Sequence, residues 1–222
     1  MLSKISTFYT LLFCLFSSHS FASLMVFDDH AAFQGAVSAG SGITLDFEPG
    51  VNPFDYFSLD YQDDYGPSTG VIDSGFNTTS GTSYLGLDIG LGFLAGADFT
   101  LSFNQVWHAI GFYLIASDEL WDADVTLMAG AGSVSNLAST TTTLSEGGQA
   151  TFVGIVDSNG FNSAQLFTYL DAFVGQGVFE FNIDDLQLVS FAGPNVPVPA
   201  PPALALLVLA ALMTLRLGRK AK

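Results

Sequence analysis

Hydrophobic and polar residues alternate with a period of two through much of this chain. Apolar side chains occupy the odd positions of 43–47 and of 99–103, and polar ones such as Thr44, Asp46 and Ser102 lie between them. This period is typical of strands that bury one face. Turn residues separate further apolar runs, which are 84–89, 109–115, 123–128, 151–156, 165–169 and 177–191. Many short strands with turns between them predict a mainly β, antiparallel β-sandwich of the jelly-roll type.

One segment near the start follows the period of a helix. In residues 28–37, Phe33, Ala36 and Val37 share one helical face. Asp28 or Asp29 supplies the side-chain oxygen that caps the first turn. The sequence therefore predicts one short N-terminal helix before the strands.

The last predicted strand changes its phase. Its apolar residues occupy odd positions as far as Ile183 and even positions from Leu186 onward. A strand keeps its apolar side chains on one face across such a change only if one extra residue is inserted. We therefore predict a β-bulge at Asp184 and Asp185.

Charge is distributed very unevenly. The chain has 21 acidic residues, 5 basic ones and a net charge of −16, and no Lys or Arg lies between residues 5 and 215. Nucleic-acid binding requires a basic surface, so this function is excluded. A hydrophobic content of 49% also excludes an acidic disordered chain. The five cations are Lys4, Arg216, Arg219, Lys220 and Lys222.

The N-terminus has the pattern of a secretory signal peptide over residues 1–22. Lys4 precedes the apolar stretch 9–16, and Ser20 and Ala22 are the small residues that signal peptidase requires before its cut. Cleavage between Ala22 and Ser23 removes Cys14, which is the only cysteine. The mature protein then has no disulfide, no thiol nucleophile and no thiolate metal ligand.

The C-terminus has the pattern of a membrane-spanning helix. A Pro-rich linker at 193–199 precedes an apolar stretch at 200–217, which as a helix is about 27 Å long and just spans a bilayer. The basic tail at 218–222 stays in the cytoplasm under the positive-inside rule. This arrangement places the acidic domain, residues 23–192, outside the inner membrane.

The order of a short proline motif, an apolar helix and a basic cluster resembles the PEP-CTERM sorting signal of exported bacterial proteins. The motif here has Val198 where the usual Val-Pro-Glu-Pro-Ala has glutamate. The resemblance implies cleavage by an exosortase in the inner membrane, release to the cell surface or extracellular matrix, and an exopolysaccharide setting. A permanent single-pass anchor is the alternative. The residues that carry the signal are Val196, Pro197, Val198, Pro199, Ala200, Arg216, Arg219 and Lys220.

Two short motifs resemble the first and last strands of jelly-roll domains in exported proteins and carbohydrate-binding modules. They are 45–48 and 181–188. In some such modules these strands pair and hold a structural Ca²⁺. The resemblance thus implies that Asp46, Glu48, Asp184 and Asp185 are the candidate Ca²⁺ ligands.

Two other acidic clusters are candidate Ca²⁺ sites, because Ca²⁺ prefers oxygen ligands. Neither has the spacing of an EF-hand loop. The alternative for every cluster is a solvated acidic surface that keeps the protein soluble. The clusters are Asp60, Asp63 and Asp64, and then Asp118, Glu119, Asp122 and Asp124.

Catalytic motifs are missing from the sequence. The mature chain has two histidines, His30 and His108, and neither a Gly-x-Ser-x-Gly nor a His-Glu-x-x-His motif. The sequence therefore predicts a non-enzymatic protein. A glycoside hydrolase with two facing carboxylates is the weaker alternative.

Several aromatic residues are candidate platforms for a sugar ring. Acids and tyrosines mix in 55–66, which we predict to be a long loop. A Ca²⁺-dependent, lectin-like module that binds polysaccharide is thus the alternative to a surface or matrix component. The same rings also suit the edge of a core. The candidates are Trp107, Trp121, Tyr61 and Tyr65, with Tyr56 beside them.

Overall fold

The computed structural model describes most of the predicted exported domain. The predicted signal peptide, with its cleavage site at Ala22 and Ser23, lies outside the described residues, as do the linker, the apolar helix and the basic tail. No helix in the described part is long and apolar enough to cross a membrane. The described residues are 24–63, 66–68, 70–74, 78–87, 93–94, 98–117, 120–145, 147–168 and 180–191.

The described chain is mainly β and its strands pair antiparallel, as predicted. It includes one α-helix, α2 (His30–Val37), and two short 3₁₀ turns, η1 (Pro53–Asp55) and η2 (Ala138–Thr140). The strands are β1 (Leu24–Phe27), β2 (Ser41–Leu45), β3 (Phe57–Asp63), β4 (Gly66–Ser68), β5 (Gly70–Ser74), β6 (Ser83–Leu87), β7 (Phe93–Leu94), β8 (Phe99–Ala116), β9 (Val125–Ala129), β10 (Gly132–Ser135), β11 (Thr142–Thr143), β12 (Gln149–Thr168) and β13 (Glu180–Ser190).

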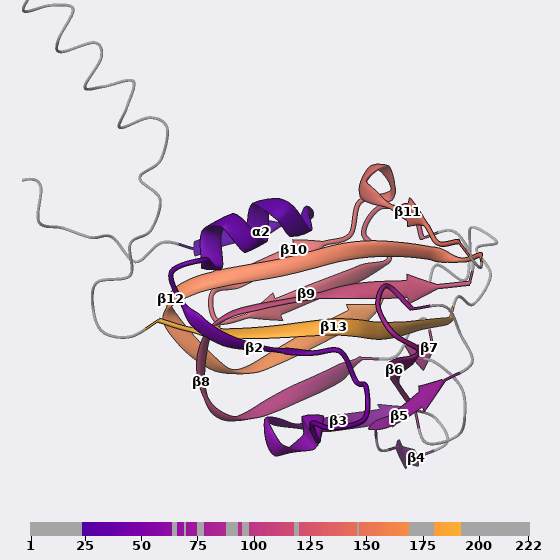
Figure 1. Cartoon of the computed structure of the whole chain (residues 1–222), viewed down its shortest axis with the longest axis horizontal. Helices are drawn as coiled ribbons and strands as arrows, with labels where there is room; N and C mark the ends of the chain where they lie inside the picture. Colours follow the sequence, from indigo (N-terminus) through magenta and orange to yellow (C-terminus); the bar gives the residue numbers. More distant parts are fainter. Residues whose placement is uncertain are drawn as a thin grey trace, which may run out of the picture.

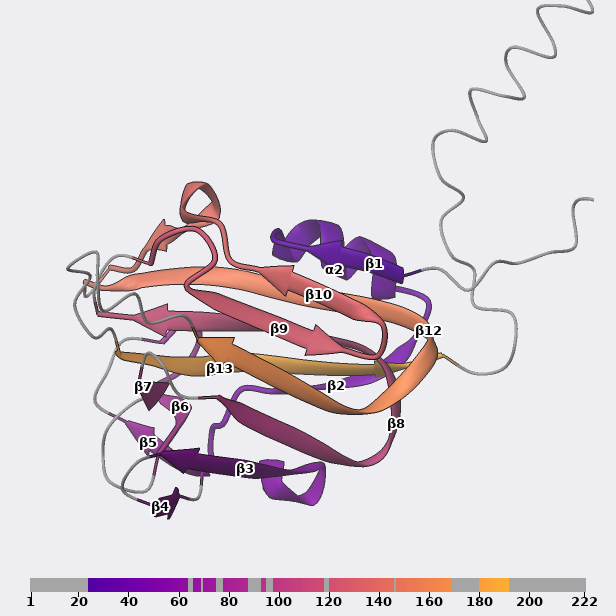
Figure 2. The same ribbon diagram turned by 180° about the vertical axis from the view of Figure 1, so that it is seen from behind.

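Two long strands organise the sheet (Figure 1). The second half of β8 pairs with β13 and with the first half of β12, and this set, together with β1, β2 and β6, is called layer I. The first half of β8 pairs with β3 and with the second half of β12, which pairs in turn with β9. This second set, together with β10, is called layer II (Figure 2). The arrangement is consistent with the predicted sandwich.

The long strands change layers at a break in their register. The pairing of β12 with β8 shifts between Val156 and Phe161. Gly160 has a φ of 74°, a conformation that side chains disfavour, and a Cβ there would meet Val106 of β8. The sequence predicted separate strands on either side of this point, whereas the structure joins each pair into one bent strand.

The main core lies between the two layers. Its aromatic centre includes Phe93 and Phe99, whose rings stack with centroids 4.4 Å apart, and Phe181 beside them. All three are almost completely buried. The inward residues of β8 and β9 surround them, which explains the period of two in the sequence.

The predicted helix packs on the outer face of layer I. Asp29 is its N-cap, and its Oδ1 accepts a hydrogen bond of 2.7 Å from the backbone N–H of Ala32. Phe33 is fully buried over Gly111 and Gly154, which face each other across β8 and β12. A Cβ on either glycine would lie 3.0 Å or less from the Phe33 ring. The two glycines therefore form a socket for this ring.

The prediction of a long loop at 55–66 is wrong. Residues 53–55 form η1, and β3 follows directly and pairs with β8. Phe57 and Tyr61 point into the core, while Ser58 and Asp60 are exposed between them. The period of two is present here too, but the many acids and tyrosines obscured it.

The predicted β-bulge is confirmed at the predicted residues. On β13, Asp184 faces Tyr113 and Gln187 faces Gly111, so β13 has one residue more than β8 over this interval. Asp185 takes the left-handed conformation, with a φ of 51°. Ile183 and Leu186 are both fully buried, because the extra residue restores the inward phase.

Candidate functional site

The bulge brings four predicted acidic residues to one region of layer I. Strand β2 pairs with β13, and Leu45, its last residue, faces Leu186. Asp46 and Glu48 follow Leu45 directly, so they leave the sheet next to the bulge that carries the other two carboxylates. This is the strand pairing that the predicted cluster required.

Asp184 and Asp185 hold the hydroxyl-rich segment 79–83. Oδ2 of Asp184 accepts hydrogen bonds from the backbone N–H and the hydroxyl of Thr79, at 2.8 and 2.7 Å, and from the N–H of Ser80. The Thr79 hydroxyl also lies 2.9 Å from Oδ2 of Asp185, and the Ser80 hydroxyl donates to Oδ1 of Asp185. The two carboxylates thus bind one end of the segment.

Glu48 holds the other end of segment 79–83. Its Oε1 accepts hydrogen bonds from the backbone N–H groups of Thr82 and Ser83. Gly81, with a φ of 58°, passes so close to Glu48 that a Cβ would collide with the carboxylate. These hydrogen bonds, that of Thr82 first, hold the pKa of Glu48 below its usual value.

Burial acts in the opposite direction on Asp184. Its side chain is completely buried, and loss of solvation raises the pKa of its carboxyl group. The negative charge of Asp185 raises this pKa further, while the hydrogen bonds from Thr79 and Ser80 lower it. Burial also raises the pKa of Tyr113, which faces Asp184 across the strands.

The hydrogen bonds of these carboxylates decide whether their oxygens are available to the predicted Ca²⁺. Within the described residues, no three His, Cys, Asp or Glu side chains are grouped so as to hold a metal ion. Both oxygens of Asp184 already accept hydrogen bonds, Oδ1 from the N–H of Asp185, and Oε1 of Glu48 accepts several. This arrangement does not fit an ion shared by Asp184 and Glu48, so the predicted Ca²⁺ has no support from this pair of carboxylates.

Chelation tests that prediction. We expect the melting temperature of the purified protein to be the same in excess EDTA and in Ca²⁺, because N–H and O–H donors already satisfy the buried carboxylate. A ligand that binds only the folded state raises its stability. A drop of several degrees in EDTA, reversed by added Ca²⁺, would contradict this expectation and assign a bound ion.

The acidic cluster around Trp121 builds a turn. The N–H of Trp121 donates to Asp124 at 2.6 Å, and its carbonyl accepts from the amide of the fully buried Asn136. Asp122 accepts from the N–H of Ala138. Burial raises the pKa of Asp124. Asp122 and Asp124 therefore hold the backbone of this turn through its N–H groups. Asp118 and Glu119 lie outside the described residues.

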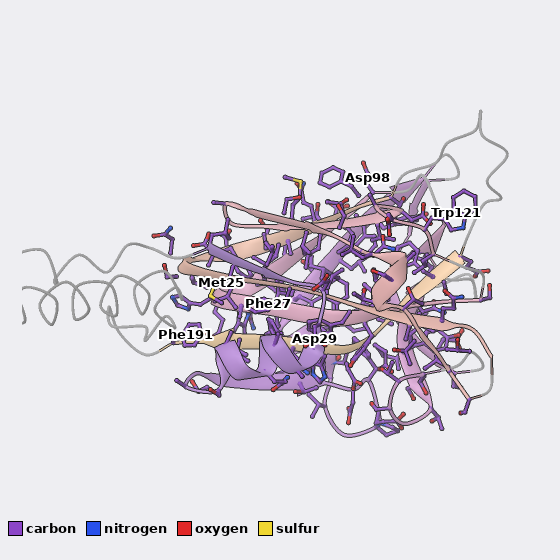
Figure 3. The ribbon with its side chains drawn as sticks, turned by 90° about the horizontal axis from the view of Figure 1, so that it is seen from above. Met25, Phe27, Asp29, Asp98, Trp121 and Phe191 are labelled. Carbon is purple, nitrogen blue, oxygen red and sulfur yellow. The ribbon has the colours of Figure 1, made fainter. Side chains whose placement is uncertain are left out.

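The structure places the aromatic candidates in different environments. Trp107 and Tyr61 are 5% and 1% exposed and belong to the core. Trp121 is 47% exposed and lies on the side of the molecule away from α2 (Figure 3). Tyr65 lies outside the described residues. Tyr56 is half-buried against the core, so Trp121 is the one exposed ring among the candidates in the described part.

The two tryptophans give a direct check of this placement. We expect a Trp107→Phe variant to emit at long wavelength and to be quenched strongly by acrylamide, because Trp121 is exposed. A Trp121→Phe variant should emit at shorter wavelength and resist the quencher. Equal quenching of both variants would contradict the burial of Trp107.

The remaining candidates lie on other elements, and Asp64 lies outside the described residues. Asp60 is exposed on β3. His30 is half-buried on α2, where its Nε2 lies 2.9 Å from the Gln187 amide. His108 is also half-buried, and its Nδ1 accepts from the N–H of Phe191. Each histidine therefore connects its own element to β13 or to the residue that follows it.

Segment 79–83 was not identified as part of the site from the sequence. Its signal is a run of hydroxyl residues, Thr78 to Ser83 with one glycine, in a domain without Lys or Arg. Hydroxyl and N–H groups are then the donors that remain for buried carboxylates.

Comparison with known proteins gives no match, whether to a family model, a curated protein or a solved structure.

Proposed function

We propose that this protein is a non-enzymatic component of the bacterial cell surface or extracellular matrix, exported and then sorted by its PEP-CTERM-like C-terminus. The observation that carries the proposal is the order of motif, apolar stretch and basic cluster at 196–222. An exosortase then acts on residues 196–200 of a precursor in the inner membrane. The domain that it releases is a sandwich of the jelly-roll type.

The organisation of the domain supports this role. It has no cysteine and no Lys or Arg, and N–H and O–H donors hold the carboxylates of Asp184, Asp185 and Glu48. Such a domain folds in an oxidising compartment without disulfides. Met25 and Phe191, which lie near the two ends of the described residues, are at the same end of the molecule (Figure 3).

Mass spectrometry of both termini tests the proposal. The protein is taken separately from the membranes and from the medium of the cells that make it. We expect an N-terminus at Ser23 and a C-terminus near 196–200 in the released form. A chain that ends at Lys222 and occurs only in membranes would instead show a permanent anchor and overturn the sorting proposal.

A further inference from the structure

The outer face of layer II is built mainly of hydroxyl side chains. Alternation along each strand turns one set of residues to the core and the other outward. The register aligns the outward set in rows across β3, β8, β12, β9 and β10. We call this set the hydroxyl face. It consists of Ser58, Asp60, Thr100, Ser102, Thr126, Met128, Ser133, Ser135, Ser163, Gln165 and Phe167.

The hydroxyl face differs from the rest of the chain in charge. Among the 21 carboxylates of the chain, two of the described ones lie at this face. They are Asp60, on the edge strand β3, and the exposed Asp98, directly before β8, whose Oδ1 accepts a hydrogen bond from the N–H of Thr168 beside Phe167. Removing water from charged groups is costly, whereas hydroxyls exchange one hydrogen-bond partner for another. This face is therefore suited to lose its water to a neutral, polar ligand.

Two apolar side chains lie within the hydroxyl face. Met128 is 41% exposed and Phe167 is 36% exposed. Gln165 lies between them in the register, since it faces Met128 on β9 and precedes Phe167 on β12. The face thus combines an exposed ring and a thioether with amide and hydroxyl groups. Ligand sites have this mixture, because apolar side chains provide contact area and polar groups fix the orientation of the ligand.

We propose that the hydroxyl face binds a neutral polysaccharide chain through Met128, Phe167 and the hydroxyl and amide groups around them. Each serine or threonine hydroxyl both donates and accepts, as the hydroxyls of a sugar do. An anionic polymer is disfavoured because the domain has no cation to attract it. The proposal names a partner for the matrix role and rests on that role.

Composition and size favour a glycan over a second protein. Protein interfaces are depleted in serine, and serine is the commonest residue of this face. Five strands about 4.8 Å apart and three rows deep give roughly 400 Å², half of the roughly 800 Å² that each partner buries in a standard interface. A polysaccharide chain needs no larger surface, because it makes contacts along its length.

Affinity electrophoresis tests the proposal with the protein as isolated from its cells. Native gels contain a neutral polymer, either hydroxyethyl cellulose, dextran or yeast mannan, or the anionic polymer alginate. We expect at least one neutral polymer to retard the protein and alginate to leave it unretarded. The Phe167→Ala/Met128→Ala double variant should need at least a tenfold higher polymer concentration to reach the same retardation.

A matched variant and a second measurement separate the outcomes. Phe54→Ala removes another exposed phenylalanine, 39% exposed on η1, and should be retarded like the wild type. Circular dichroism checks that each variant is folded. No retardation by any neutral polymer, or equal retardation of the double variant, overturns the proposal. A dimer in ultracentrifugation that the double variant abolishes also overturns it, because a second copy then occupies the face.

The result is independent of the sorting experiment. If the termini show a permanent anchor and the gels show retardation, the proposed function fails and the glycan site stands. If the termini show release and the gels show no retardation, the reverse holds.

Discussion

Replacing Phe33 by alanine is expected to lower the free energy of unfolding by about 3–5 kcal/mol, the usual cost of removing a buried phenylalanine. The ring fills the socket over Gly111 and Gly154 and also contacts Phe27 and Phe152. Without it, α2 loses its main apolar contact with layer I. Urea unfolding followed by circular dichroism measures the change.

The matched control for this prediction is Phe54→Ala. The Phe54 ring is exposed and contacts Phe57 at the edge of the core, so we expect a loss below about 1 kcal/mol. Gly154→Ala tests the socket from the other side, because its methyl group would lie 2.8 Å from the Phe33 ring. Equal stability of wild type and Phe33→Ala would show that α2 does not depend on this ring.

Replacing Asp184 by alanine is expected to cost about 1–3 kcal/mol at acidic pH, because it leaves backbone N–H groups of Thr79 and Ser80 without their acceptor. The cost should be smaller at neutral pH. The raised pKa of Asp184 means that the folded state binds its proton more tightly than the unfolded state. The contribution of this group to stability therefore falls as the pH rises from about 4 through the raised value.

Urea unfolding of wild type and Asp184→Ala at pH 4 and pH 7 measures this difference directly. Asp60→Ala is the control, because Asp60 is exposed and should change the stability by less than about 0.5 kcal/mol at either pH. The pKa of Glu48 is lowered, so its contribution to stability increases with pH. Because this contribution is the same in wild type and variant, it cancels in the difference between them. A cost for Asp184→Ala that grows from pH 4 to pH 7 would contradict the expected pH dependence.

The helix and the bulge were predictable because local rules decide them. A capping aspartate followed by apolar residues three and four apart is enough to place α2. The phase change between Ile183 and Leu186 is enough to place the bulge, since a fully buried strand tolerates no outward leucine. The resemblance implied that the strand at 45–48 pairs with the last strand. In the structure β2 pairs with β13 through residues 41–45, so Leu45 alone of that motif lies in the pairing.

The long strands and the partners of the carboxylates depend on contacts that are distant in the sequence. The shift near Gly160 keeps β12 continuous, whereas glycine and asparagine there suggested a turn. Trp107 is buried by the corner that β8 forms, which its neighbours in the sequence do not reveal. Thr79 meets Asp184 across 105 positions, and no local pattern encodes that contact.

The continuity of β8 and β12 through both layers has a mechanical consequence. In a sandwich whose sheets are joined only by loops, a force that separates the sheets is resisted by side-chain packing alone. Here the two backbones themselves cross from layer II to layer I. A force applied to layer II is therefore transmitted to layer I through the covalent chain of β8 and β12 and through their strand pairing. Layer I includes β13, which ends next to Phe191 at one end of the molecule. Such a domain resists being peeled apart while one end is held.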